Sequence, residues 1–285
     1  MKFLSNITLK ASAGFGFCLL ASIISSNEKV YANTCEALFG DNPSSINNPG
    51  YIPPTTYKIR VYEMGLCTSD PLAGTYINDD DDVVTDNSIS ESSCTATFQS
   101  STGSLVNLGG SSTQTLTGNN FRPPTGTYPH AYIKIQNTFG LKGSYQINNE
   151  TFYTSSDGSP VQSEGSHSEF DEDLMDFSNG KTCSSSPELA GAEVFTAGVT
   201  GTMKAVLAQV SGGNLGTYTA DSSCGSSTHL YGSFEPTTPV VISDQTKGLE
   251  VNFSITGRGM TVFPDGRGGM SGFGGVPFSP SFATF

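Results

Sequence analysis

Carboxylates are the residues in this sequence whose type and spacing come nearest to a chemical site. One run of four aspartates and a second acidic segment, Asp171–Asp173, concentrate oxygen ligands of the kind that suit Ca²⁺. The run lacks the glycine and distal glutamate of an EF-hand loop, so a solvated acidic turn is the competing interpretation, and the one we favour, for both segments. The candidate calcium ligands are Asp79, Asp80, Asp81 and Asp82.

Catalytic signatures are missing from the sequence. No Gly-x-Ser-x-Gly elbow occurs, and the histidines His130, His167 and His229 stand in unrelated contexts. Neighbouring exposed carboxylates lack the divergent environments that separate an acid from a base in glycosidases. No two cysteines have zinc-site spacing, and no glycine-rich loop joins a strand pattern to a helix pattern. The sequence therefore predicts a chain that is not an enzyme and has no cofactor apart from the candidate Ca²⁺.

Aromatic side chains suggest a second kind of site. Four tyrosines on or beside predicted strands would form a platform for sugar rings if they shared an exposed face: Tyr62, Tyr76, Tyr132 and Tyr153. Surface glycans are then possible partners. Formal net charge is −13, which repels phosphate backbones, so nucleic acid is not expected as a partner.

The N-terminal segment, residues 1–32, is typical of a secretory signal peptide. It has a basic start, an apolar stretch from Ala11 to Ser26 and small residues before Asn33. Its apolar run is too short and too rich in Gly and Ser for comfortable membrane spanning, and no later run has spanning length. We expect a secreted or cell-surface protein without a transmembrane segment after removal of the signal.

Cysteines fit export, because exported chains oxidise paired thiols. Sequence contexts favour the pairs Cys67–Cys94 and Cys183–Cys224, although sequence alone does not fix connectivity. Cys35 is left over, either buried near the mature N-terminus or bonded to another chain.

Period-two alternation dominates the mature chain and predicts an all-β fold. In residues 56–64, Tyr57, Ile59 and Val61 form the expected inward set. Residues 131–139, 145–147 and 151–154 predict a three-stranded meander that turns at Asn148-Asn149. Residues 249–255 alternate most regularly and are the expected core partner of the meander. Short strands with turn signals indicate an antiparallel β-sandwich, one large or two small, held by disulfides.

Composition divides the chain into segments. After the signal peptide, residues 33–154 and 191–263 are two sandwich parts, possible parts of one domain, separated by a polar acidic connector, residues 155–190. In the connector, Phe170 to Phe177 are compatible with one short amphipathic helix. The last segment, residues 264–285, is a tail rich in Gly and Phe, either a strand of its own sandwich, a disordered end or a strand added to a neighbour's groove.

A short motif resembles the secreted prealbumin-like (transthyretin-like) and Ig-like surface modules. Pro123, Pro124, Gly126, Thr127 and Tyr128 form the matching turn, and residues 131–139 form the core strand that follows it. The resemblance covers about a third of the mature chain by our reading of the motif. It implies a β-sandwich and transfers no catalytic residues.

The expected function is that of an exported, non-enzymatic structural or adhesive protein, assembling through its tail. The alternative is a secreted module that binds carbohydrate or calcium.

Overall fold

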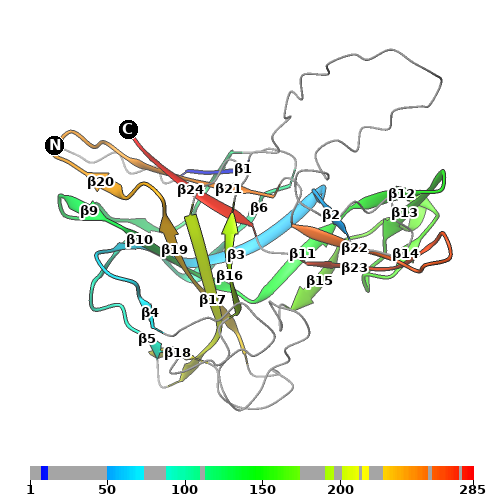
Figure 1. Ribbon diagram of the computed structural model, residues 1–285, viewed down its shortest axis with the longest axis horizontal. Helices are drawn as coiled ribbons and strands as arrows, with labels where there is room; N and C mark the ends of the chain where they lie inside the picture. Colours follow the sequence, from blue (N-terminus) through cyan, green and yellow to red (C-terminus); the bar gives the residue numbers. More distant parts are fainter. Residues whose placement is uncertain are drawn as a thin grey trace.

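The structure is a computed structural model that describes residues 8–11, 50–73, 88–109, 113–173, 190–195, 201–211, 214–217, 227–255, 259–275 and 278–285. Within these ranges the chain forms strands and one short 3-10 turn, η2 (Glu164–Ser166), as Figure 1 shows. This confirms the predicted all-β class. All strand pairings that the structure describes are antiparallel except the pairing of β1 with β21.

The largest sheet has ten strands and joins both halves of the sequence. Its main path runs through β15 (Phe170–Asp173), β11 (Thr138–Lys142), β3 (Thr56–Cys67), β10 (His130–Gln136), β19 (His229–Pro236), β17 (Gly201–Ser211) and β16 (Ala190–Phe195). β6 (Cys94–Asn107), β8 (Asn119–Asn120) and β18 (Asn214–Thr217) pair off this path. Because β10 pairs with β19 from Ala131 to Gln136, residues 33–154 and 191–263 contribute to one sheet.

Smaller sheets surround this one. A four-stranded sheet has the order β24 (Ser279–Thr284), β21 (Leu249–Ser254), β1 (Thr8–Ala11), β7 (Thr113–Thr115). Two three-stranded sheets are β12 (Ser144–Ile147), β13 (Glu150–Thr154), β14 (Pro160–Val161), and β2 (Gly50–Ile52), β22 (Met260–Pro264), β23 (Met270–Gly275). Two further pairs are β20 (Val240–Ile242) with β9 (Gly126–Tyr128), and β4 (Leu72–Ala73) with β5 (Ser88–Ile89).

The core lies between the ten-stranded and four-stranded sheets. Tyr57 of β3 is fully buried, as predicted with Ile59 and Val61, and its ring meets Phe278 at 6.4 Å between centroids. Phe278 in turn packs edge-on against Phe253 of β21 at 4.3 Å. The predicted strand 249–255 therefore does face the first half of the chain across the core. The two sheets packed on one core form a layered, sandwich-like architecture.

A bulge in β3 changes which residues face the core. The pairing of β3 with β6 shifts between Val61 and Glu63, and a bulge of this kind places one extra residue in a strand. After it, Met64 and Leu66 take the buried core positions. Glu63 therefore lies on the face of the sheet opposite to Val61, although strict alternation would place both side chains on the same face.

The predicted meander is correct in its hairpin and wrong in its first strand. Asn148 and Asn149 have φ of 49° and 67°, the left-handed conformation that asparagine tolerates, and they join β12 to β13. Residues 131–139, however, divide at Asn137 into β10 and β11, which belong to the ten-stranded sheet and not to the sheet of the hairpin.

The expected helix over Phe170 to Phe177 is wrong for its described part. Phe170–Asp173 forms β15, which pairs with β11 at the edge of the ten-stranded sheet. Phe170 is buried and Asp171 exposed, so the segment has the alternation of a strand. Residues 174–189 lie outside the described residues.

The C-terminal segment is built into the fold. Residues 260–275 form the β22–β23 hairpin, and β24 pairs with all six residues of β21. Phe285 holds the end of this segment beside the start of β21, since its carbonyl oxygen accepts hydrogen bonds from the backbone N–H groups of Lys247 and Gly248. Of residues 1–32, the structure describes only β1.

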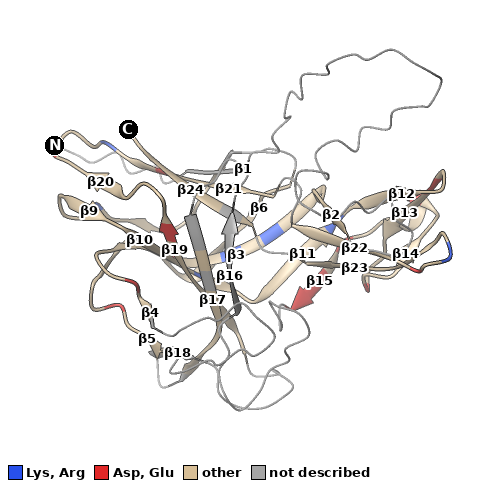
Figure 2. Ribbon diagram, in the orientation of Figure 1, with Lys and Arg blue, Asp and Glu red and all other residues tan. Residues whose placement is uncertain are grey.

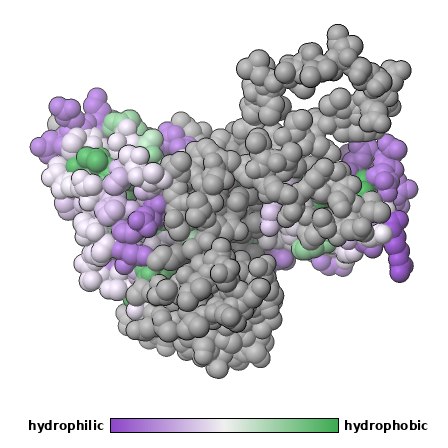
Figure 3. Space-filling view, viewed as in Figure 1, coloured by the Kyte–Doolittle hydropathy of each residue, from purple (hydrophilic) through white to green (hydrophobic). Residues whose placement is uncertain are grey.

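On the face seen in Figure 3, the coloured surface is mostly hydrophilic or intermediate, with small hydrophobic areas. Most strands in Figure 2 carry few charged positions, and β15, with three consecutive acidic residues, is the exception. Exposed large apolar side chains come from different elements: Leu105, Phe121, Val210, Val241, Phe263 and Phe285. Single exposed apolar residues of this kind are normal on soluble proteins.

Candidate functional site

The strongest local feature is a disulfide between the two longest strands. Cys67 ends β3, Cys94 begins β6, and the two are direct partners across the sheet with their Cα atoms 4.0 Å apart. This confirms the predicted Cys67–Cys94 bridge. The bridge closes a 27-residue separation. By the loop-entropy relation, closing a loop of that length stabilises the fold by about 3–4 kcal/mol.

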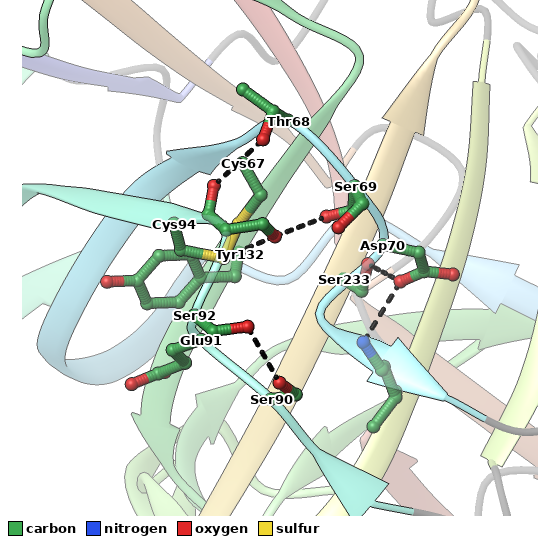
Figure 4. The surroundings of a disulfide bond; sticks show 12 residues. Cys67, Thr68, Ser69, Asp70, Ser90, Glu91, Ser92, Cys94, Tyr132 and Ser233 are labelled. Atoms are coloured by element: carbon green, nitrogen blue, oxygen red, sulfur yellow. Dashed lines mark hydrogen bonds between the residues drawn. A yellow bond between two sulfur atoms is a disulfide. The ribbon is translucent and has the colours of Figure 1, made fainter.

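Hydrogen bonds hold the closed loop against the sheet, as Figure 4 shows. Thr68 N–H donates to Ser93 O at 3.0 Å, and the Ser93 hydroxyl donates to Ser69 O at 3.2 Å. Asp70 Oδ1 accepts from Leu72 N–H at 3.0 Å and from the Ser233 hydroxyl at 2.8 Å. Because Ser233 belongs to β19, Asp70 fastens the loop to a strand from the other half of the sequence.

Beside the disulfide, two tyrosines stack on the face of the sheet opposite the main core. The ring centroids of Tyr132 in β10 and Tyr231 in β19 lie 5.7 Å apart, and the two ring planes are nearly parallel. They belong to a second apolar cluster with Cys67, Leu72, Val206 and Ala208. Burial raises the pKa of both hydroxyls, with further contributions from Glu63 for Tyr132 and from Glu91 for Tyr231. Both side chains are therefore protonated at physiological pH.

A lysine and two glutamates complete the group, which we call the brace cluster: Glu63, Glu91, Tyr132, Lys134 and Tyr231. Lys134 Nζ lies 3.0 Å from Glu63 Oε1 and 2.9 Å from Glu91 Oε2. The Tyr132 hydroxyl donates to the same Glu63 oxygen at 2.5 Å. Lys134 is thus enclosed by acceptors, with a side chain only 14% exposed. The cluster connects β3, β10, β19 and the disulfide loop.

The chemistry open to the brace cluster is structural. Glu63 accepts from three side chains, the Tyr132 hydroxyl, Lys134 Nζ and Gln99 Nε2, so its carboxylate links β3 to both β10 and β6. Among the residues that the structure describes, no three His, Cys, Asp or Glu side chains are grouped so that they could hold a metal ion. The arrangement fixes strands and orients side chains.

A second row of polar and aromatic side chains follows the same face along β3. Tyr62 lies against His229 at 4.7 Å between ring centroids, and Arg60 Nε donates to Gln136 Oε1 at 3.2 Å. The row is half-buried. Burial, with help from Lys134, lowers the pKa of His229, so its ring is neutral at pH 7.

At the far end of this row, Lys58 and Glu169 form an ion pair at 2.6 Å. An aromatic pair, an arginine and an amide on one face are groups that can contact a sugar ring. The half-buried set, which we call the β3 row, is Lys58, Arg60, Tyr62, Gln136 and His229.

The predicted tyrosine platform is wrong in its membership. Tyr132 is 3% exposed and inside the brace cluster, so it offers no surface to a ligand. Tyr62 and Tyr153 lie in different sheets, where Tyr153 packs against His167 at 5.0 Å. Tyr76 lies outside the described residues.

Several other predicted site residues also fall outside what the structure describes. The candidate calcium ligands Asp79 to Asp82 lie between residues 73 and 88, and Cys35, Cys183 and Cys224 lie in other gaps. The Cys183–Cys224 bridge and the calcium site stay predictions.

Sequence reasoning missed the brace cluster. Lys134 carried a signal, because it is the single charge within the regular alternation of residues 131–135. Glu63 carried a misleading signal, because strict alternation places it on the same face as Val61 and only the bulge moves it.

In comparisons with known proteins, no family model, no curated protein and no solved structure matches this chain. In the described residues, no helix has the length and apolar character needed to cross a membrane.

Proposed function

We propose that the chain is an exported structural or adhesive protein of the cell surface or extracellular space, without enzymatic activity. The observation that carries the proposal is the Cys67–Cys94 bridge between the two longest strands. Disulfides of this kind persist in oxidising compartments outside the cytosol. The brace cluster fits the proposal, since Glu63, Tyr132 and Lys134 hold β3 and β10 together.

Localisation and thiol mapping of the native protein test this proposal. Thiol-trapped protein from fractionated cells is expected to show the Cys67–Cys94 peptide pair in the extracellular or surface fraction. N-terminal sequencing is expected to begin at Asn33. Native protein in the cytosol with both thiols free would contradict the proposal.

Assembly through the tail, in this structure, requires β24 to leave β21 and pair with a second copy. Exchange of a terminal strand keeps the same contacts between chains, which makes it a low-cost route to assembly. A deletion of residues 264–285 is a poor test, because it removes the buried Phe273 and Phe278. Size-exclusion chromatography with the exposed-tip variant Phe285→Ser is the sharper measurement. Unchanged assembly in a folded variant would contradict a role for the tail.

Carbohydrate binding is the second candidate function, and the β3 row favours it. Tyr62→Ala is expected to abolish retention on a glycan array, because stacking on its ring would be lost. Tyr153→Ala, in a different sheet, is the matched control. Equal retention of the two variants would exclude the β3 row.

Calcium binding at Asp79–Asp82 is tested by a thermal shift. Millimolar Ca²⁺ is expected to raise the melting temperature of the exported protein, because a ligand that binds only the folded state stabilises it. Substitution of the four aspartates by asparagine should remove the shift. No shift in the unmodified protein would rule the site out.

A further inference from the structure

The strand β1 occupies a place that export would empty. It lies between β21 and β7, with Leu9 opposite Val251, Lys10 opposite Asn252 and Ala11 opposite Phe253. The inference rests on the proposed export, because that proposal removes residues 1–32 and β1 with them. β21 would then keep β24 on one edge and lose its neighbour on the other.

An empty place at this position is unfavourable. With β1 in place, Val251 is 3% exposed and Phe253 is fully buried, so the removal of β1 uncovers backbone groups beside buried side chains. Backbone N–H and C=O groups in such a setting are almost always paired. Another strand between β21 and β7 would restore the backbone hydrogen bonds that the removal of β1 breaks.

The sequence contains a match to β1 just after the expected cleavage point. Thr8-Leu9-Lys10-Ala11 and Thr34-Cys35-Glu36-Ala37 have the same order of types: threonine, an apolar residue, a charged residue, alanine. Placed in the register of β1, Cys35 comes opposite Val251, Glu36 opposite the half-exposed Asn252, and Ala37 opposite Phe253. Free cysteine behaves as a small apolar residue, so the pattern suits a half-buried strand.

Twelve residues, 38–49, separate the matching segment from β2. β1 runs parallel to β21, so its Ala11 end lies toward Ile255, shortly before β22. β22 pairs with β2, and Met260 lies opposite Ile52 and Val262 opposite Gly50. Residues 38–49 connect Ala37 to Gly50, and a chain of that length spans up to roughly 40 Å. A tethered segment also has a far higher effective concentration than a segment of another molecule.

We propose that, once the leader is removed, residues 34–37 of the same chain replace β1 between β21 and β7. The leader holds this place in the precursor, and the new N-terminus fills it in the mature protein. The site is the strand-wide opening between β21 and β7, and its occupant is the chain's own N-terminal segment.

Engineered disulfide trapping tests the register directly. In exported protein with Cys35→Ser, the pair Glu36→Cys and Asn252→Cys is expected to form a bond within one chain, seen by peptide mapping and as a monomer on a non-reducing gel. The matched control is Glu36→Cys with Ser281→Cys. Ser281 pairs with Asn252 from the other edge, so it lies two strands away and beyond bonding range.

Hydrogen exchange gives a second measurement. Deleting residues 34–37 from the exported chain is expected to speed amide exchange of Val251 to Phe253 by about tenfold or more, because an unpaired edge opens locally. Exchange in the β22–β23 hairpin should not change.

Three results would overturn the inference: a bond between the two introduced cysteines that links two chains, no such bond in the folded protein, or unchanged exchange after the deletion. N-terminal sequencing separates this failure from failure of the proposed export. If residues 1–32 are retained, the export processing is wrong and β1 keeps its place; if Asn33 is the first residue, only the strand replacement is wrong.

Discussion

Glu63 links its own strand, β3, to two side chains of the neighbouring strand β10. It accepts from the Tyr132 hydroxyl and pairs with Lys134, and both partners are largely buried. Buried donors that lose their acceptor carry a desolvation cost that exceeds the net value of the original bond.

Glu63→Ala is therefore expected to lower the free energy of unfolding by about 1–3 kcal/mol, measured by urea denaturation. Glu235→Ala, an exposed position on β19, should change it by less than about 0.5 kcal/mol. In the Glu63→Ala background, Tyr132→Phe should cost less than in the unmodified chain, because the hydroxyl has already lost its partner. Strict additivity of the two substitutions would mean that the hydrogen bond contributes nothing.

Glu172 predicts a pH dependence of stability. Burial is the main cause that raises the pKa of this carboxyl, and Asp173 adds to it. The folded state then holds its proton to higher pH than the unfolded chain. The contribution to stability is complete below the ordinary pKa of a glutamate and is lost as the pH rises through the folded value.

Glu172→Gln is accordingly expected to gain stability relative to the unmodified protein as the pH increases from about 4 to about 8, in a series of thermal melts. The exposed neighbour Asp171→Asn is the control. A difference between Glu172→Gln and the unmodified chain that stays constant across this range would refute the assignment.

At the scale of elements, the β12–β13 hairpin depends on two residues in the left-handed conformation. Asn148 also donates from Nδ2 to Gly268 O at 3.3 Å, which ties this hairpin to the β22–β23 turn. The turn at Asn148-Asn149 therefore connects two sheets.

Asn149→Val is expected to destabilise the protein by about 1–2 kcal/mol, because a β-branched residue strains the left-handed region. Asn149→Gly should be neutral or slightly stabilising, since glycine adopts this conformation without strain. Thermal or urea melts of the two variants give the comparison. Equal stabilities would show that the turn relaxes to another conformation.

At the scale of the whole molecule, the two halves of the sequence share one core. β10 from the first half pairs with β19 from the second, and Tyr57 meets Phe253 through Phe278. Buried residues of both halves belong to one apolar cluster.

Separately expressed residues 33–154 and 191–285 are therefore expected to show unfolded circular dichroism spectra with no cooperative melt. Mixing the two fragments should restore part of the strand signal if they associate. A cooperative transition in either fragment alone would show that the chain contains two independent domains.

The strands with regular alternation were predictable, and the way in which they assemble was not. The strands at residues 56–64 and 249–255 are predicted correctly, because half-buried strands reveal their inward set through period two. The separation of residues 131–139 into β10 and β11, and the change of face at Glu63, depend on long-range pairing and a bulge, which local sequence does not encode. The disulfide was predictable from its contexts, whereas the brace cluster needed the register.

The pairing of β2 with β22 determines when this protein can finish folding. Gly50–Ile52 finds its partner only in Met260–Val262, some 210 residues later in the sequence. At about 5–20 residues per second, the ribosome needs roughly 10–40 s to deliver that partner after β2 has emerged. Throughout this interval β2 remains without its final neighbour, whereas β3 already has β6 and β10 beside it. The pairing of β2 is therefore completed only after residues 260–262 have been synthesised.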